Sequence, residues 1–124
     1  MCTAISYRRK TSYFGRNLDL DRGYGEKVVI TPRNYEIKLR CENHIISHYA
    51  MIGMACVGDD FPLYFEAVNE KGLAMAGLNF PENASYYHFA VEKNNVTPFE
   101  FIPWVLAQCS CVDEAKQLLD KVNL

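Results

Sequence analysis

Hydrophobic and polar positions along the first two-thirds of the chain form the short runs that are typical of β-strands. The segments "CTAISY" (2–7) and "SYFGRNLDL" (12–20) are separated by a polar turn. The next segment, "EKVVITPRNYEIKLR" (26–40), is rich in β-branched and aromatic residues but contains Pro32. Because proline removes a donor from a β-ladder, Pro32 is expected at a bulge, at an edge or between two strands.

Two further apolar segments follow, "SHYAMIGMACVG" (47–58) and "YFEAVNEKGLAMAGLNF" (64–80). Both are apolar on the two faces of a strand instead of alternating, which indicates a sheet that is covered on both sides. Within the second segment, Asn69-Glu70-Lys71-Gly72 predicts a hairpin turn in which Gly72 adopts a positive φ.

The period changes near residue 97, where Thr97-Pro98-Phe99-Glu100 has the pattern of a helix start. Apolar residues then recur at helical spacing: Phe101, Ile102, Val105, Leu106 and Cys109. A second capping pattern, Ser110-x-x-Asp113, precedes another apolar stripe: Val112, Ala115, Leu118, Leu119 and Val122. The chain, residues 1–124, is therefore predicted to form one α+β domain in which antiparallel strands are followed by a helix pair that covers one sheet face.

Composition and charge exclude several classes of protein. With 49% hydrophobic and 23% charged residues, the chain is globular and not disordered. The net charge of −2 and the absence of a basic stripe argue against a nucleic-acid partner. No apolar stretch approaches the ~20 residues of a membrane span, and the first ten residues lack the apolar core of a signal peptide. An odd count of five cysteines fits a reducing compartment, so a cytoplasmic location is expected.

Two groups of residues could bind metal, and for each a structural role is the favoured interpretation. Cys109-Ser110-Cys111 lacks the two-residue spacer and the second ligand pair of a zinc or redox motif, so buried thiols are expected. Cys41, His44 and His48 have suitable spacing but no evident fourth ligand, so a polar connection between strands is expected. No metal or organic cofactor is predicted.

Cys2 combines two reactive groups if Met1 is removed, because it then carries both a thiol and a free α-amine. In small peptides a thiol titrates near ~8.5 and an α-amine near ~7.7–8.0, so one residue can supply a nucleophile and its base. Arg16 and Asp19 follow a turn that returns the chain beside the first strand. An arginine near the thiol favours the thiolate, and an aspartate can hold the α-amine.

Strand geometry limits how these residues can meet. Residues three apart in a regular strand point to opposite faces, so the backbone has to bulge or leave the strand near Asn17-Leu18 for both Arg16 and Asp19 to reach Cys2. The alternative is a salt-bridged strand end.

Four segments in order, "MCTAISY", "YFGRNLDLD", "VVITPRNY" and "NEKGLAMAGLNFP", resemble the choloylglycine hydrolase family of N-terminal-nucleophile hydrolases, which includes bile salt hydrolases and penicillin V acylases. The resemblance spans essentially the whole chain. It implies that Cys2 is the nucleophile, that Arg16 lies beside it and that Asp19 positions the new α-amine. It also implies that Asn79 lies in the region that supplies an oxyanion-hole donor.

The resemblance further implies the N-terminal part of a four-layer αββα sandwich, because family members are more than twice as long. Residues 1–124 are thus expected to form an incomplete domain. The second half of a full-length member would supply more strands, a second asparagine and another arginine. Full-length members are expected to form homotetramers. The loop "VGDDFPLYF" is expected to give an apolar wall for a steroid, together with two leucines that follow Arg16. The side chains concerned are Phe61, Leu63, Tyr64, Phe65, Leu18 and Leu20, and each of them could equally belong to the core.

The function that follows from the resemblance is a cysteine amidase that hydrolyses glycine- or taurine-conjugated bile acids through a thioester. Asparagine at position 79 resembles the bile salt hydrolases, whereas penicillin V acylases tend to have tyrosine there. A penicillin V acylase or another linear amide hydrolase is the alternative within the family. An inactive remnant that serves as an interaction module is the alternative outside enzymes.

Overall fold

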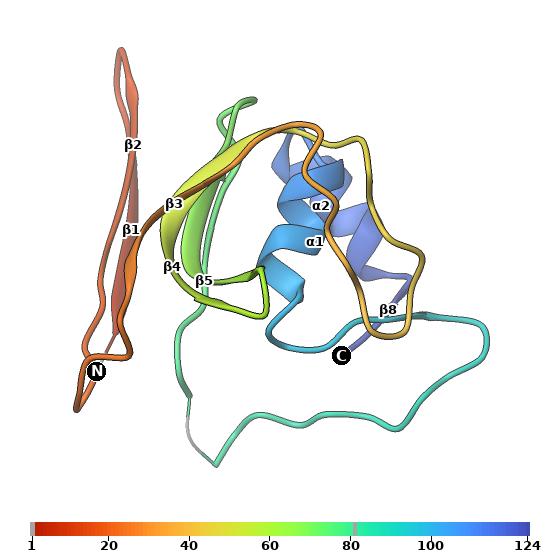
Figure 1. Ribbon diagram of the computed structural model, residues 1–124. Helices are drawn as coiled ribbons and strands as arrows, with labels where there is room; N and C mark the ends of the chain where they lie inside the picture. Colours follow the sequence, from red (N-terminus) through yellow and green to blue (C-terminus); the bar gives the residue numbers. More distant parts are fainter. Residues whose placement is uncertain (1, 81) are drawn as a thin grey trace.

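The chain folds into three layers, namely a β-hairpin, a four-stranded sheet and a helix pair (Figure 1). This structure is a computed structural model that describes residues 2–80 and 82–124. The expected removal of Met1 therefore lies outside the described residues. Antiparallel strands followed by two helices confirm the predicted α+β class.

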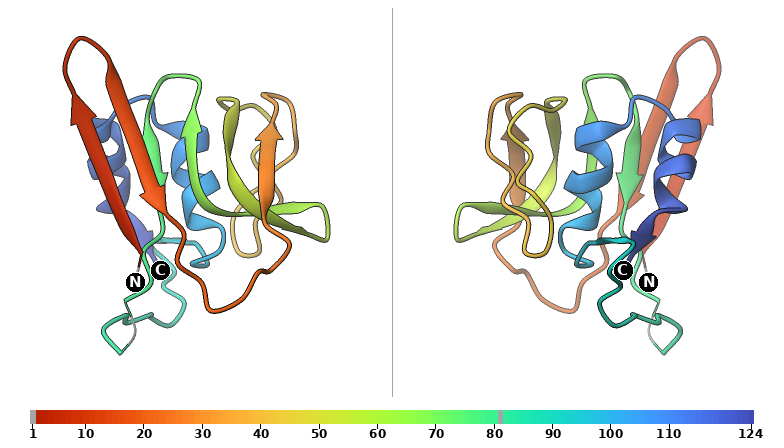
Figure 2. Two further views of the ribbon diagram at one scale, coloured as in Figure 1. Left: turned by 90° about the vertical axis from the view of Figure 1, so that its left-hand side faces the viewer. Right: turned by 90° about the vertical axis from the view of Figure 1, so that its right-hand side faces the viewer.

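The first layer is the hairpin of β1 (Thr3–Arg8) and β2 (Ser12–Asn17), which are antiparallel with Thr3 opposite Asn17 and Arg8 opposite Ser12. It stands apart from the other strands on the side away from the helices (Figures 1 and 2). The rings of Tyr7 and Tyr13 lie opposite each other with centroids 6.5 Å apart. The second strand ends at Asn17, so the chain leaves it at Leu18, where the geometric argument required a break.

The second layer is an antiparallel sheet in the order β3-β4-β5-β6. Its strands are β3 (Lys27–Thr31), β4 (Met51–Gly58), β5 (Phe61–Asn69) and β6 (Ala74–Ala76). Pro32 follows the last residue of β3, which agrees with a position between strands. The connection from 33 to 50 contains one isolated bridge, Ile37 to Ile45.

The predicted turn between β5 and β6 is confirmed. Gly72 has a φ of 86°, and the Asn69 amide donates to the Leu73 carbonyl at 2.9 Å. The buried Asn69 side chain adds a role that the sequence did not reveal. Its Oδ1 accepts from two amides of the turn, and its Nδ2 donates to the carbonyl oxygens of Leu106 and Cys109 at 2.9 and 2.7 Å. The turn is therefore joined to the end of the first helix.

The third layer consists of α1 (Phe101–Gln108) and α2 (Val112–Leu119). Before α1, the Glu100 carboxylate accepts from the Thr97 amide at 3.0 Å, as in one half of a capping box. The predicted start at Thr97-Pro98 is wrong, because the N-cap is Glu100 and the helix begins at Phe101. Before α2, the Ser110 amide and hydroxyl donate to Glu114 and not to Asp113, which corrects the predicted pair. The reason is that Cys111 is the N-cap, so Glu114 is the third helical residue.

The end of the second helix also differs from the prediction, because Val122 does not extend its apolar stripe. The helix ends at Leu119, and β8 (Val122–Asn123) pairs in parallel with β7 (Asn94–Asn95). The Val96 amide donates to the Asn123 carbonyl at 3.0 Å. Backbone hydrogen bonds from a distant segment thus override the local helical pattern.

The core lies between the sheet and α1. Ala55, Tyr64 and Ala67 of the sheet are buried there with Trp104 and Leu106 of the helix. The opposite face, which we call the outer face, carries exposed apolar residues: Val28, Ile30 and Ile52. The prediction that helices cover one face of the sheet is confirmed. The prediction that both faces are covered is wrong for the described residues, because the outer face is exposed. No helix in 2–80 or 82–124 is long and apolar enough to cross a membrane.

Candidate active site

Cys2 lies immediately before β1 and is half-buried. Its Sγ lies 3.8 Å from the backbone carbonyl oxygen of Asp19, within hydrogen-bonding range for sulfur. The amide of the next residue, Thr3, donates to the Asn17 side chain at 2.6 Å. The start of β1 and the end of β2 therefore hold the thiol close to the segment that follows Asn17.

Arg16 lies at the same end of the hairpin as Cys2. It pairs with Ala4, two residues after Cys2 along the chain. β2 ends at Asn17, so Asp19 is not bound by strand alternation, and its backbone carbonyl oxygen lies beside the Cys2 sulfur. The structure thus brings three of the four predicted catalytic residues to one end of the hairpin.

The Arg16 side chain crosses from the hairpin to the sheet. Its Nη1 donates to Glu66 Oε2 at 2.8 Å, and its Nη2 donates to the Gly77 carbonyl at 2.9 Å. The side chain is 3% exposed. Sequence reasoning missed Glu66. The available signal was a single carboxylate inside the apolar run of β5, a position that requires a partner when it is buried.

Asn79 is exposed and lies in the segment after β6, two residues beyond Gly77. Because Arg16 holds the Gly77 carbonyl, the segment that carries Asn79 is attached to the hairpin that carries Cys2. The role of Asn79 as an oxyanion donor stays a prediction.

The side chains predicted to form an apolar wall lie in two segments of the chain, and their role stays a prediction. Leu18 and Leu20 are half-buried after β2, and Phe61 and Phe65 are half-buried in β5, as is Leu63. Phe61 packs against the core. Tyr64 belongs to the core, where its hydroxyl lies 2.8 Å from Thr31 Oγ1, and burial raises its pKa.

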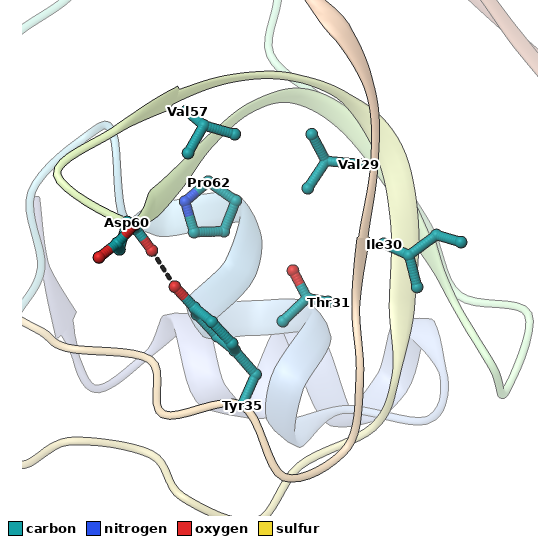
Figure 3. A pocket seen from close by; sticks show the side chains of 7 residues that line it. All are labelled: Val29, Ile30, Thr31, Tyr35, Val57, Asp60 and Pro62. Carbon is teal, nitrogen blue, oxygen red and sulfur yellow. Dashed lines mark hydrogen bonds between the residues drawn. The ribbon is translucent and has the colours of Figure 1, made fainter.

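A small cavity lies between β3 and the β4–β5 connection (Figure 3). Its volume is about 100 Å³, and its lining consists of Val29, Ile30, Thr31, Tyr35, Val57, Asp60 and Pro62. The Tyr35 hydroxyl donates to the Asp60 carbonyl across its mouth. Pockets for drug-sized ligands measure ~300–1,000 Å³, so this cavity alone does not enclose a steroid.

His48 and His44 have hydrogen-bond partners within the protein. His48 is buried, with its two ring nitrogens 2.7 Å from the carbonyl oxygens of Tyr49 and Tyr35, and His44 pairs with Glu36 at 2.9 Å. Among residues 2–80 and 82–124, no three His, Cys, Asp or Glu residues form a group that could hold a metal ion. All five cysteines are free.

The pair at 109 and 111 is buried only in part. Cys109 is buried, whereas Cys111 is exposed, so the prediction of two buried thiols holds for the first alone. Burial raises the pKa of the Cys109 thiol, and the nearby Glu114 and Cys111 act in the same direction. Cys109 is therefore the less reactive type of thiol.

Comparisons with known proteins agree on one family. The family profile described as "Linear amide C-N hydrolases, choloylglycine hydrolase family" matches residues 2–124. A bile salt hydrolase/transferase of Lactiplantibacillus plantarum is 48% identical over 124 residues, which cover 100% of this chain and 38% of the relative. A conjugated bile acid hydrolase of Lactobacillus gasseri is 40% identical, over 100% of this chain and 40% of the relative.

The fold gives the same answer. A crystal structure of a mutant conjugated bile acid hydrolase from Clostridium perfringens superimposes with a TM-score of 0.90 at 35% identity, over 99% of this chain and 39% of that chain. This chain therefore spans about two-fifths of the length of the relatives that it matches. On the sequence and the fold together, the chain belongs to the choloylglycine hydrolase family of linear amide C-N hydrolases.

Proposed function

We propose that this chain carries the nucleophile of an enzyme that hydrolyses the amide bond of glycine- or taurine-conjugated bile acids. The observation that carries the proposal is the placement of the Cys2 thiol at the end of the hairpin, 3.8 Å from the Asp19 carbonyl and two residues before Ala4, the partner of Arg16. The substrate class follows from the relatives, several of which are described as bile salt or conjugated bile acid hydrolases.

In the proposed reaction, removal of Met1 frees the α-amine of Cys2, which accepts the thiol proton. The sulfur attacks the amide carbonyl carbon, and a donor near Asn79 stabilises the resulting oxyanion. The C–N bond then breaks, the proton passes to the leaving glycine or taurine nitrogen, and a thioester of the bile acid remains. Water hydrolyses this thioester and restores the thiol. Every proton is carried by the protein or by water, so no cofactor is required.

The enzyme we propose is longer than 124 residues, because the chain spans 38–40% of its relatives. The outer face and the hairpin support this proposal, since both expose apolar side chains that further strands could cover. A homotetramer remains our proposal for the longer form, to be measured by light scattering coupled to size exclusion. Five free thiols support a reducing compartment, in line with the proposed cytoplasmic location.

The test uses a chimera in which the part of the Lactiplantibacillus plantarum relative that follows the matched segment continues this chain. We expect glycocholate hydrolysis, a mature chain that begins at Cys2 and a loss of activity of at least about 10³-fold in Cys2→Ala. Mass spectrometry of the quenched enzyme is expected to detect the cholyl thioester on the peptide that contains Cys2. Activity in a preparation that retains Met1 would contradict the proposed base.

Substrate preference within the family is tested at Asn79. We expect kcat/KM for glycocholate to exceed that for penicillin V in the parent chimera and the ratio to fall in Asn79→Tyr. Faster penicillin V hydrolysis by the parent would establish the acylase alternative and leave Cys2 as the nucleophile. A chimera that folds but hydrolyses neither substrate would favour the inactive remnant.

A further inference from the structure

A β-bulge in β5 determines where Glu66 points. Tyr64 lies opposite Ala55 and Glu66 lies opposite Met54, so Phe65 has no partner in β4. Tyr64 and Ala67 are both buried on the helix side of the sheet, although they are three residues apart. Regular alternation cannot place both on one face, and the extra residue resolves the conflict.

The consequence is that Glu66 lies on the outer face. Without the bulge it would share the face of Tyr64 and be buried under α1. With the bulge it shares a face with Met54 and Ala76, on the side of the sheet where the hairpin stands (Figure 1). Bulges that re-aim a side chain are frequent beside active sites.

Close packing of β4 and β5 at Gly53 accompanies the bulge. A Cβ atom at Gly53 would lie 1.9 Å from the Glu66 carbonyl oxygen and 2.6 Å from the Ala67 Cα. Glycine is required there because only hydrogen fits against the backbone of the bulged strand. The position of Glu66 is thus built into two strands and does not depend on a flexible loop.

Glu66 receives the Arg16 guanidinium. One terminal nitrogen of Arg16 donates to the carboxylate at 2.8 Å and the other to the Gly77 carbonyl at 2.9 Å, so both ends of the guanidinium plane are held. The Arg16 Nε is buried and has no hydrogen-bond partner among the described residues. A buried donor without a partner is rare in folded proteins and needs an explanation, such as an ordered water or a bound ligand.

We propose that Glu66 is a positioning residue of this site, which holds Arg16 so that its remaining Nε–H and its charge serve the amide substrate at the Cys2 end of the hairpin. This inference rests on the proposed function. The Arg16 side chain, through its contacts with Glu66 and Gly77, connects three segments that the reaction requires together. They are the hairpin with Cys2, the bulged strand with Glu66 and, through Gly77, the segment that leads to Asn79.

The experiment compares Glu66→Gln with Glu66→Asp in the chimera described above. Glutamine keeps the shape but loses the charge, and a guanidinium displaced by about 1 Å can lower kcat about 100-fold with a much smaller change in KM. Aspartate keeps the charge, so we expect kcat of Glu66→Asp to be at least about tenfold higher than kcat of Glu66→Gln. Glu70→Gln is the matched control, because Glu70 also pairs with an arginine, Arg33, but lies at the distant β5–β6 turn.

A second measurement separates positioning from folding. The rate at which iodoacetamide alkylates Cys2 at pH 7, followed on the Cys2 peptide by mass spectrometry, is expected to differ from the parent value in Glu66→Gln, because the position and the net charge of Arg16 change, and to stay at the parent value in Glu70→Gln. In an Arg16→Met background, Glu66→Gln is expected to change this rate by less than about twofold, because Glu66 acts through Arg16.

The outcomes distinguish this inference from the proposed function. If the parent chimera hydrolyses glycocholate and Glu66→Gln keeps kcat within about twofold, the inference is wrong and the function stands. An equal loss in the parent and in the Arg16→Met background also overturns it, since Glu66 would then act independently of Arg16. If the parent is inactive but the alkylation rate depends on Glu66 through Arg16, the positioning role stands and the proposed substrate is wrong.

Discussion

The two faces of the four-stranded sheet carry similar apolar side chains but have opposite environments. On the helix side, Ala55 and Tyr64 are buried against Trp104. On the outer face, Val28 and Ile30 remain 65% and 66% exposed. The difference shows that hydrophobicity alone does not select the face that packs. The helix pair follows the sheet in the chain and covers one side of it, and the other side meets the hairpin through polar contacts of Arg16.

The comparison also separates stability from chemistry. Close-packed apolar contacts lie on the helix side, whereas the residues proposed for catalysis lie on the hairpin and along the outer face. Substitutions on the two sides are therefore expected to change different measured quantities.

The largest expected effect is on the helix side, in Trp104→Ala. Trp104 is 4% exposed and stacks with Phe101 at a centroid distance of 6.3 Å, so its removal leaves a large cavity. We expect the free energy of unfolding to fall by about 4 kcal/mol in urea titration. Phe99→Ala is the control, because Phe99 is 70% exposed, and its effect should stay within about 0.5 kcal/mol. Equal effects would mean that the core does not lie under α1.

Between the two faces, Gly53→Ala tests the bulged strand. The new methyl group meets the backbone of Glu66 and Ala67, which cannot move without disturbing the ladder. We expect a loss of about 2–3 kcal/mol in the same titration. In the same strand, a Cβ at Gly58 would meet Leu63 at an ordinary 3.9 Å, so Gly58→Ala should be far milder. Similar values for the two variants would contradict the close approach at Gly53.

A smaller, pH-dependent effect is expected at the β5–β6 turn. Hydrogen bonds from Arg33 and then from the Ala50 amide lower the pKa of Glu70 to about 2. The folded pKa lies below that of an unfolded glutamate, near ~4.3, so the stabilisation is complete above that value and is lost as the pH falls through about 2. The thermal midpoints of parent and Glu70→Gln should differ most above pH ~5 and converge toward pH ~2. A constant difference across this range would exclude the carboxylate as the cause.

The smallest effect on stability is expected on the outer face, in Ile30→Thr. The side chain is 66% exposed, so the free energy of unfolding of the 124-residue chain should change by less than about 0.5 kcal/mol. Its solubility should rise, because an apolar patch is interrupted. In the longer chimera the same substitution should be destabilising if further strands cover this face. An equal, negligible effect in both would show that the outer face stays open.

Local features were predictable where short-range chemistry decides them. The turn at 69–72 formed as expected because glycine adopts a positive φ at little cost. Two helices formed in the predicted order, but their N-caps are Glu100 and Cys111 and not the predicted Thr97 and Ser110. The end of the second helix was not predictable. Val122 fits a helical stripe, yet backbone bonds to the segment around Asn94 place it in a strand.

The sequence predicted most residues that belong to the candidate site but not the contacts that they make. Cys2, Arg16 and Asp19 were named from motifs, and the break after Asn17 followed from strand geometry. Glu66 was not named from the sequence, and a two-residue period applied to β5 would have assigned it to the buried face with Tyr64. The unpaired Phe65 reverses that assignment, and no local pattern in the sequence marks Phe65 as the bulged residue.

By itself, the sequence determined the α+β order of elements, the hairpin turn at Gly72 and membership of the choloylglycine hydrolase family, because turn chemistry, periodicity and motif order are written residue by residue. The tertiary structure alone decided which sheet face is covered, where Glu66 points and what Arg16 contacts. These features depend on pairing between residues as far apart as Arg16 and Gly77. Such pairing is set by the balance of packing and hydrogen bonding in the whole fold, which short-range patterns do not contain.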